Sequence, residues 1–189
     1  MTLQQIVQSY IRFIRPHSRG ELNWFRDQNT LRAAVETAAR AIDSNGKMYS
    51  HQWRVRKIAR AKALQTLLDN LSRIGQSASF DDLFSLVNRI LEPIDGIGEL
   101  YIYDTSLRIG AKMNLLPRKV YLHAGTRVGA KALDFDVSRG TLSFRELNPF
   151  FPGLLPHEME DVLCIFKDAL KRNSIKFVQD TVLKRSWCG

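Results

Sequence analysis

The chain has 189 residues, the length of one domain or of one domain with an additional lobe. Hydrophobic residues make up 44% and charged residues 25%, which excludes an intrinsically disordered chain, and no apolar run approaches the length of a membrane-spanning helix. The net charge of +9, from 28 Lys and Arg against 19 Asp and Glu, favours a polyanionic partner, with nucleic acid as the first candidate.

The first half of the chain shows the apolar spacing that is typical of helices. Apolar residues at helical intervals predict a helix over 3–14, which Pro16 should stop. An alanine-rich run predicts a second helix over 29–42, closed by a turn that ends at Gly46. The longest apolar pattern predicts a third helix over 50–74.

The middle of the chain continues the helical pattern. Ser79 is followed by Asp82 three residues later, which resembles a capping box and predicts the start of a helix. Pro93 should end this helix. Further helices are predicted over 99–112 and over 124–133.

The last third of the chain mixes shorter elements. Residues 118–122 predict a short strand, and 135–152 are consistent with a hairpin and one short helix. Pro156 with the acids that follow it predicts a helix start, because proline suits the first turn and acids favour the positive end of the helix dipole. This helix should reach about Lys171, and a last helix is predicted over 174–184.

Together these patterns predict an all-α fold, a compact multi-helix domain of about eight helices over residues 1–189. A division into two lobes would separate a helical bundle over 1–75 from a second lobe over 76–189. The chain shows no internal repeat and no low-complexity linker.

The positive charge is concentrated in two segments that contain no acid. The first, 44–68, holds Lys47, Arg54, Arg56, Lys57, Arg60 and Lys62. The second, 105–133, holds Arg108, Lys112, Arg118, Lys119, Arg127 and Lys131. Segregation of this kind predicts a positive face that binds nucleic acid, and the alternative is a solvated helix face.

The most informative segment is 91–104, in which a tight turn separates two predicted helices. Gly96 and Gly98 allow backbone angles that other residues avoid, and they let the chain approach a ligand without a Cβ in the way. Ile97 between them should pin the turn to the core. The free N–H groups at the start of the next helix favour a phosphate. The structural alternative is that Gly96 only ends the preceding helix.

This segment resembles the helix-hairpin-helix motif of DNA repair and recombination proteins, whose hairpin has the form Gly-hydrophobic-Gly. The resemblance implies a hairpin that grips the DNA backbone without reading its sequence, often with a monovalent cation beside it. The residues expected to contact nucleic acid are Gly96, Ile97, Gly98, Arg54, Lys57, Arg108, Lys112, Arg118, Lys119, Arg127 and Lys131.

The resemblance extends in degenerate form to the base-excision DNA glycosylases that are built on this motif. In that superfamily a Val-Asp-x-His segment follows the hairpin, and Val120-Tyr-Leu-His123 falls at a similar distance here. The catalytic Asp is matched by Tyr121, and the Lys that some members carry after the hairpin is matched by Leu100. Tyrosine cannot replace the carboxylate at neutral pH, and leucine cannot form a Schiff base. The scaffold should therefore lack glycosylase chemistry.

Other residues are weaker candidates for chemistry. The four histidines are scattered without metal-ligand spacing, so we expect no metal site. Cys164 should lie in the core. Trp53 should anchor its helix, or alternatively stack a base beside Arg54. Two cysteines are too few for a disulfide framework, and with no secretory signal this favours a cytoplasmic protein that does not bind membranes.

The sequence thus predicts a DNA-binding protein that contacts phosphates through the hairpin and a basic face, largely independently of sequence. A divergent glycosylase-like enzyme is the first alternative, and its catalytic candidates are Asp104, Tyr121 and His123. A helical adaptor for an acidic protein partner is the second alternative.

Overall fold

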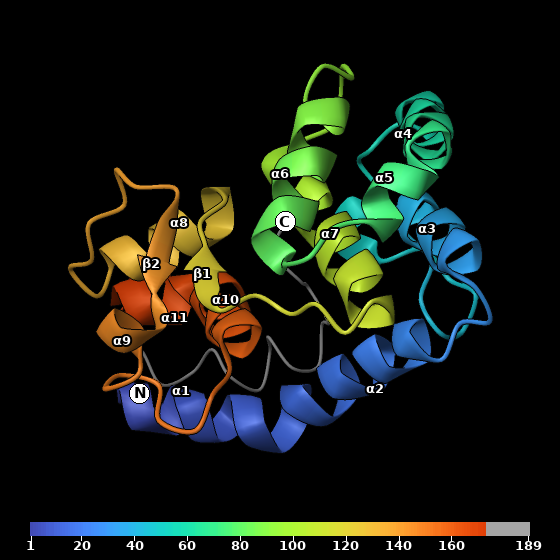
Figure 1. Cartoon of the computed structure of the whole chain (residues 1–189). Coiled ribbons are helices and arrows are strands. Elements are labelled where there is room, and N and C mark those ends of the chain that lie inside the picture. The colour runs from blue at the N-terminus through green and yellow to red at the C-terminus, as the bar shows by residue number, and fades with distance from the viewer. Residues whose placement is uncertain (173–189) are drawn as a thin grey trace. The chain divides into compact units, whose positions relative to one another are not determined.

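The computed structural model describes residues 1–172, which are mostly helical and include one small two-stranded sheet (Figure 1). The all-α prediction is confirmed in this broad form. The described helices exceed the expected eight, because the helices predicted over 50–74 and from Pro156 to Lys171 are each divided and because a helix over Arg15–Arg26 was not predicted. The chain forms two compact units, one from Met1–Ser18 with Arg118–Gly189 and the other from Arg19–Pro117. This division differs from a boundary near residue 76, because the first unit joins segments from both ends of the sequence. The predicted helix over 174–184 lies outside the described residues.

The N-terminal helices continue past the proline that was expected to stop them. Helix α1, Leu3–Ser9, leads into a π-helical turn, Tyr10–Ile14, and then into α2, Arg15–Arg26. The Arg15 N–H donates to the Tyr10 carbonyl, so the chain is wound more widely just before Pro16. A wider turn relieves the clash that a proline ring makes in a regular α-helix, so the helix is not broken there.

The second unit begins its helical packing with α3, Leu31–Arg40, which Thr30 caps. The single helix predicted over 50–74 is instead a 3₁₀ turn at Ser50–Gln52, α4 at Lys57–Asp69 and α5 at Leu71–Gly75. Asn70 lies between the last two helices, and its side-chain amide donates to a carbonyl of the preceding turn. A local side-chain bond of this kind competes with helix continuation.

Helices α6, Phe80–Leu91, and α7, Glu99–Lys112, complete this unit and match their predictions closely. Ser79 caps α6 as expected, since its hydroxyl accepts the Asp82 N–H at 3.1 Å. Helix α7 packs against α3 and α6, and α4 packs against α3 and α6. The core between them is made of the apolar residues Val35, Leu67, Ile74, Leu83, Val87, Leu91, Ile102 and Ile109.

The other unit combines α1 with the elements that follow residue 118. These are β1 (Lys119–Tyr121), α8 (Ala124–Lys131), β2 (Thr141–Ser143), α9 (Phe144–Leu147), α10 (Pro156–Ile165) and α11 (Lys167–Arg172). The two strands pair antiparallel, with Val120 opposite Leu142. Buried acids of α10 hold the N-terminal segment, because Arg15 makes two hydrogen bonds to the Glu158 carboxylate at 2.7 and 2.8 Å. Among residues 1–172, no helix has both the length and the apolar character needed to cross a bilayer.

Candidate nucleic-acid interface

The turn between α6 and α7, residues 92–98, is a compact hairpin. The Ile94 N–H donates to the Leu91 carbonyl at 2.9 Å, and the Ile97 N–H donates to the Ile94 carbonyl at 3.0 Å. Gly96 has a φ of +86°, a left-handed conformation that strains any residue with a side chain. Ile94 and Ile97 are half-buried against the apolar core of this unit, so Ile97 pins the turn as predicted.

The start of α7 is open to a ligand. Gly98 is the residue that precedes the helix, and no side chain caps the helix there. Its backbone is extended, and a Cβ added at Gly98 would meet no atom within 4 Å. Amide groups at the start of a helix attract anions, although Glu99 places a negative charge in the first turn.

The start of α4 lies beside this hairpin. The Arg56 guanidinium forms an ion pair with the Asp95 carboxylate. A Cβ added at Gly96 would lie 3.5 Å from the Arg56 Nη2 atom and 3.7 Å from the Ala59 Cβ. Arg56 precedes the first residue of α4, and no side chain caps that helix either. Two uncapped helix starts and a cation are therefore adjacent within one unit.

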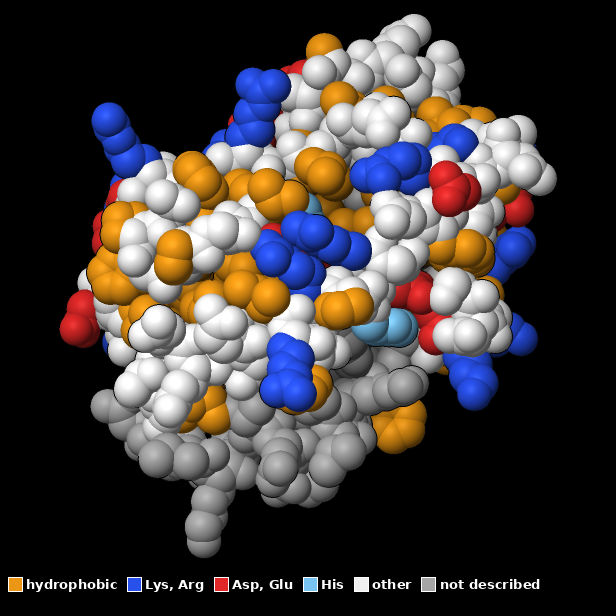
Figure 2. Space-filling model, turned by 90° about the horizontal axis from the view of Figure 1, so that it is seen from below, with side chains coloured by type: hydrophobic (Ala, Val, Ile, Leu, Met, Phe, Trp, Pro, Cys, Tyr) orange, Lys and Arg blue, Asp and Glu red, His pale blue; other side chains and the backbone are white. Residues whose placement is uncertain are grey.

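Exposed cations and an exposed aromatic ring surround this contact. Arg54, Arg56 and Lys57 are exposed, and Trp53 is 72% exposed. The expectation that Trp53 anchors its helix is therefore not met, because most of the side chain is exposed. Figure 2 shows a different face of the molecule, seen from below, on which Lys and Arg side chains also lie beside exposed hydrophobic side chains. We call the set Trp53, Arg54, Arg56, Lys57 and Ile58 the α4 edge.

The remaining basic candidates fall into different environments. Arg118 and Lys131 are exposed, whereas Lys119 and Arg127 are half-buried. The Lys112 ammonium donates to the carbonyls of Arg26, at 3.0 Å, and of Gln28. Lys112 therefore closes a loop of its own unit. The second basic segment is divided between the two units, because the boundary falls at residues 117 and 118.

Arg108 is the basic candidate that the structure places in the interior. It is 6% exposed, and its Nη2 atom lies 3.1 Å from the Asp104 carboxylate. Its guanidinium stacks over the Tyr49 ring at 3.9 Å from the centroid. Burial raises the pKa of the Tyr49 hydroxyl, and the positive charge of Arg108 opposes that rise. Asp104 and Arg108, four residues apart on α7, thus form an ion pair, and Arg108 offers no exposed charge.

Asp104 joins the 3₁₀ turn to α7. Its Oδ2 atom accepts the Gln52 amide at 2.5 Å, lies 2.7 Å from the His51 Nε2 atom, and pairs with Arg108. Gln52 is 1% exposed, so this junction is internal. The catalytic candidates are not gathered in one unit, because Asp104 belongs to Arg19–Pro117 whereas residues 121 and 123 belong to the other unit.

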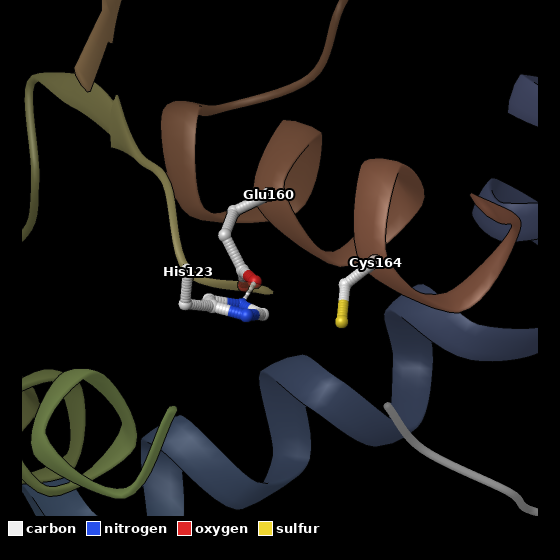
Figure 3. Close-up of side chains that lie close together, drawn as sticks. All are labelled: His123, Glu160 and Cys164. Atoms are coloured by element: carbon white, nitrogen blue, oxygen red, sulfur yellow. Dashed lines mark hydrogen bonds and ion pairs between the residues drawn. The ribbon is translucent and has the colours of Figure 1, made fainter. Parts of the chain in front are cut away.

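A second cluster, in the other unit, escaped prediction. His123 precedes α8, and Glu160 and Cys164 lie four residues apart on α10 (Figure 3). The His123 Nε2 and Glu160 Oε1 atoms are 2.5 Å apart, and one ligand atom from each of the three buried residues lies within 4.8 Å of the others. The four-residue spacing of Glu160 and Cys164, which places both on one face of a helix, is the sequence signal that could have revealed this cluster. Cys164 is buried as predicted and is not a free thiol.

Comparison with known proteins returns no match: no family model, no curated protein and no solved structure matches this chain.

Proposed function

We propose that this protein binds DNA through the phosphate backbone, with the hairpin at 92–98 and the α4 edge as the contact surface. The observation that carries the proposal is the left-handed Gly96, which brings the open start of α7 beside the start of α4 and the Arg56 guanidinium. Helix starts and arginine side chains are the two protein groups best suited to a phosphate.

The surface suits a backbone contact more than a base contact. Gly98 has no side chain that could reach a base edge, and a phosphate oxygen can approach its backbone because a Cβ there would stand in open space. The helix-hairpin-helix resemblance also implies a monovalent cation beside the hairpin. Recognition would therefore depend on DNA structure and ionic strength and little on sequence.

The other unit adds exposed cations to the proposal. Arg118 and Lys131 are exposed, and Lys119 lies over the Tyr121 ring with its ammonium 5.4 Å from the centroid. With about five or six phosphates neutralised in the complex, the log–log dependence of the binding constant on salt should have a slope of about −5.

The two alternatives have less support. A catalytic Asp104 would need to be available to a substrate, whereas its Oδ2 atom is bonded to three side chains of its own unit. An adaptor for an acidic protein would use the same exposed cations as a DNA-binding protein. A competition experiment between duplex DNA and the acidic protein therefore distinguishes the two partners. Duplex DNA should displace a bound acidic protein if the hairpin is built for phosphates.

The experiment compares Gly98→Asp with Ser72→Asp, which adds the same charge on the exposed surface of α5. Aspartate is a good residue at a helix start, so Gly98→Asp should leave the melting temperature unchanged or slightly raised. Its carboxylate would occupy the helix start and repel phosphate, so affinity for a duplex at low salt should fall about tenfold or more.

Fluorescence anisotropy with a labelled duplex gives the affinity, and circular dichroism on the same samples gives the melting temperature. Ser72→Asp should weaken binding only slightly, because it acts through long-range charge that salt screens. Equal effects of the two variants, or no binding of the wild-type protein at low salt, would refute the proposal.

A further inference from the structure

The α4 edge exposes more apolar surface than a phosphate contact needs. Trp53 is 72% exposed and Ile58 is 63% exposed, and the cations Arg54, Arg56 and Lys57 stand between them in the sequence. Tryptophan is usually well buried, and at surfaces it is enriched where another molecule binds. Exposed tryptophan among cations therefore indicates a ligand with both a flat apolar face and negative charge.

The backbone next to Trp53 is held in place by hydrogen bonds of the neighbouring residue. Trp53 directly follows the 3₁₀ turn, and the residue before it, Gln52, is buried and hydrogen-bonded to Asp104 of α7. The Val55 N–H also donates to the Gln52 carbonyl at 3.0 Å. A side chain presented on an ordered backbone loses less conformational entropy when it binds.

The edge is also tied to the hairpin. Arg56, three residues after Trp53, forms the ion pair with Asp95 and lies against Gly96. A DNA strand whose phosphate reaches the hairpin would therefore pass a surface that carries an indole ring. In an intact duplex the faces of the bases are covered by their neighbours, so this ring could stack only where the base stack is interrupted.

We infer that Trp53 stacks on an unpaired base, so that the α4 edge directs the protein to DNA with a gap or a bulge rather than to intact duplex. This inference rests on the proposed function. Every nucleobase offers a π-face, so the preference would be for structure and not for sequence. A lipid surface also accepts tryptophan beside cations, but it offers no particular match to the open helix starts that lie next to Arg56.

The test compares three ligands: an intact duplex, the same duplex with a two-nucleotide gap, and vesicles that contain anionic lipid. The wild-type protein should bind the gapped DNA about tenfold more tightly than the intact duplex. Trp53→Ala should remove this preference, so that the variant binds gapped and intact duplex with equal affinity. Trp53→Phe should retain most of the preference, because a smaller aromatic ring still stacks. Since Trp53 is exposed, thermal melting should be the same for all three proteins.

The outcomes separate this inference from the proposed function. Gly98→Asp should weaken binding to both DNA ligands equally, because it acts on the phosphate contact. If the wild-type protein binds both DNAs and Trp53→Ala keeps the preference for the gap, or if no preference exists, the stacking role is wrong and the proposed function stands. If neither DNA binds, both fail. Vesicle binding that depends on Trp53, without any effect of Trp53→Ala on DNA, would assign the edge to a membrane instead.

Discussion

The Arg56 guanidinium is ion-paired with the Asp95 carboxylate, 39 residues further along the chain. This contact joins the start of α4 to the hairpin that precedes α7. Both side chains are largely exposed, at 62% and 91%, so the pair contributes little to stability. The pair also affects the local charge, because Asp95 offsets the positive charge of Arg56 beside the hairpin.

Removing this offset should strengthen DNA binding. In Asp95→Asn the Arg56 charge is no longer neutralised, so affinity for duplex DNA at low salt should rise about two- to fivefold. The free energy of unfolding should change by less than about 1 kcal/mol. Asp27→Asn makes the same charge change at another exposed position of this unit and is the control. Similar gains in both variants would mean that net charge alone, and not the hairpin, sets the affinity.

Arg108 should behave as a structural residue. Arg108→Ala leaves the Asp104 carboxylate without its cation in a largely buried setting, so the protein should lose about 3 kcal/mol of stability. The salt slope of DNA binding by the folded protein should not change. Arg54→Ala is the contrasting variant, because Arg54 is exposed and its loss should reduce the slope by about one without altering stability.

Chemical denaturation and anisotropy on both variants check this prediction. If Arg108→Ala reduces the salt slope and does not lower stability, Arg108 contacts DNA and the prediction is wrong.

Gly129 should be intolerant of any side chain. A Cβ at Gly129 would lie 2.0 Å from the Leu163 carbonyl oxygen, so α8 and α10 would have to separate. We expect Gly129→Ala to lose more than about 3 kcal/mol of stability, measured by urea denaturation. At Gly140 a Cβ would meet nothing within 4 Å, and Gly140→Ala should change stability by less than about 0.5 kcal/mol. Equal stabilities for the two variants would show that α8 and α10 do not pack this closely.

Local signals predicted local structure well. The bounds of α7 and the cap of α6 were read correctly, because hydrophobic period, a capping serine and a proline act over a few residues. The prediction at Pro16 was wrong because a π-helical turn accommodates the proline, and nothing in the residue pattern announces such a turn. The helix predicted over 50–74 is divided at two places. Before α4, Gln52 and His51 bond to Asp104 of α7, a contact remote in sequence, and after α4 the Asn70 side chain bonds to a carbonyl of the preceding turn.

For the candidate interface, the sequence determined the charge, the two acid-free basic segments and the Gly-Ile-Gly turn between helices. Those features depend on composition and on neighbours along the chain. Only the tertiary structure decided which cations face solvent, because exposure depends on packing between distant elements. It buried Arg108 against Asp104 and Tyr49, exposed Trp53, and set Arg56 beside Gly96. The side chains of His123, Glu160 and Cys164 also come together only in the folded chain, because α10 packs against both β1 and α8.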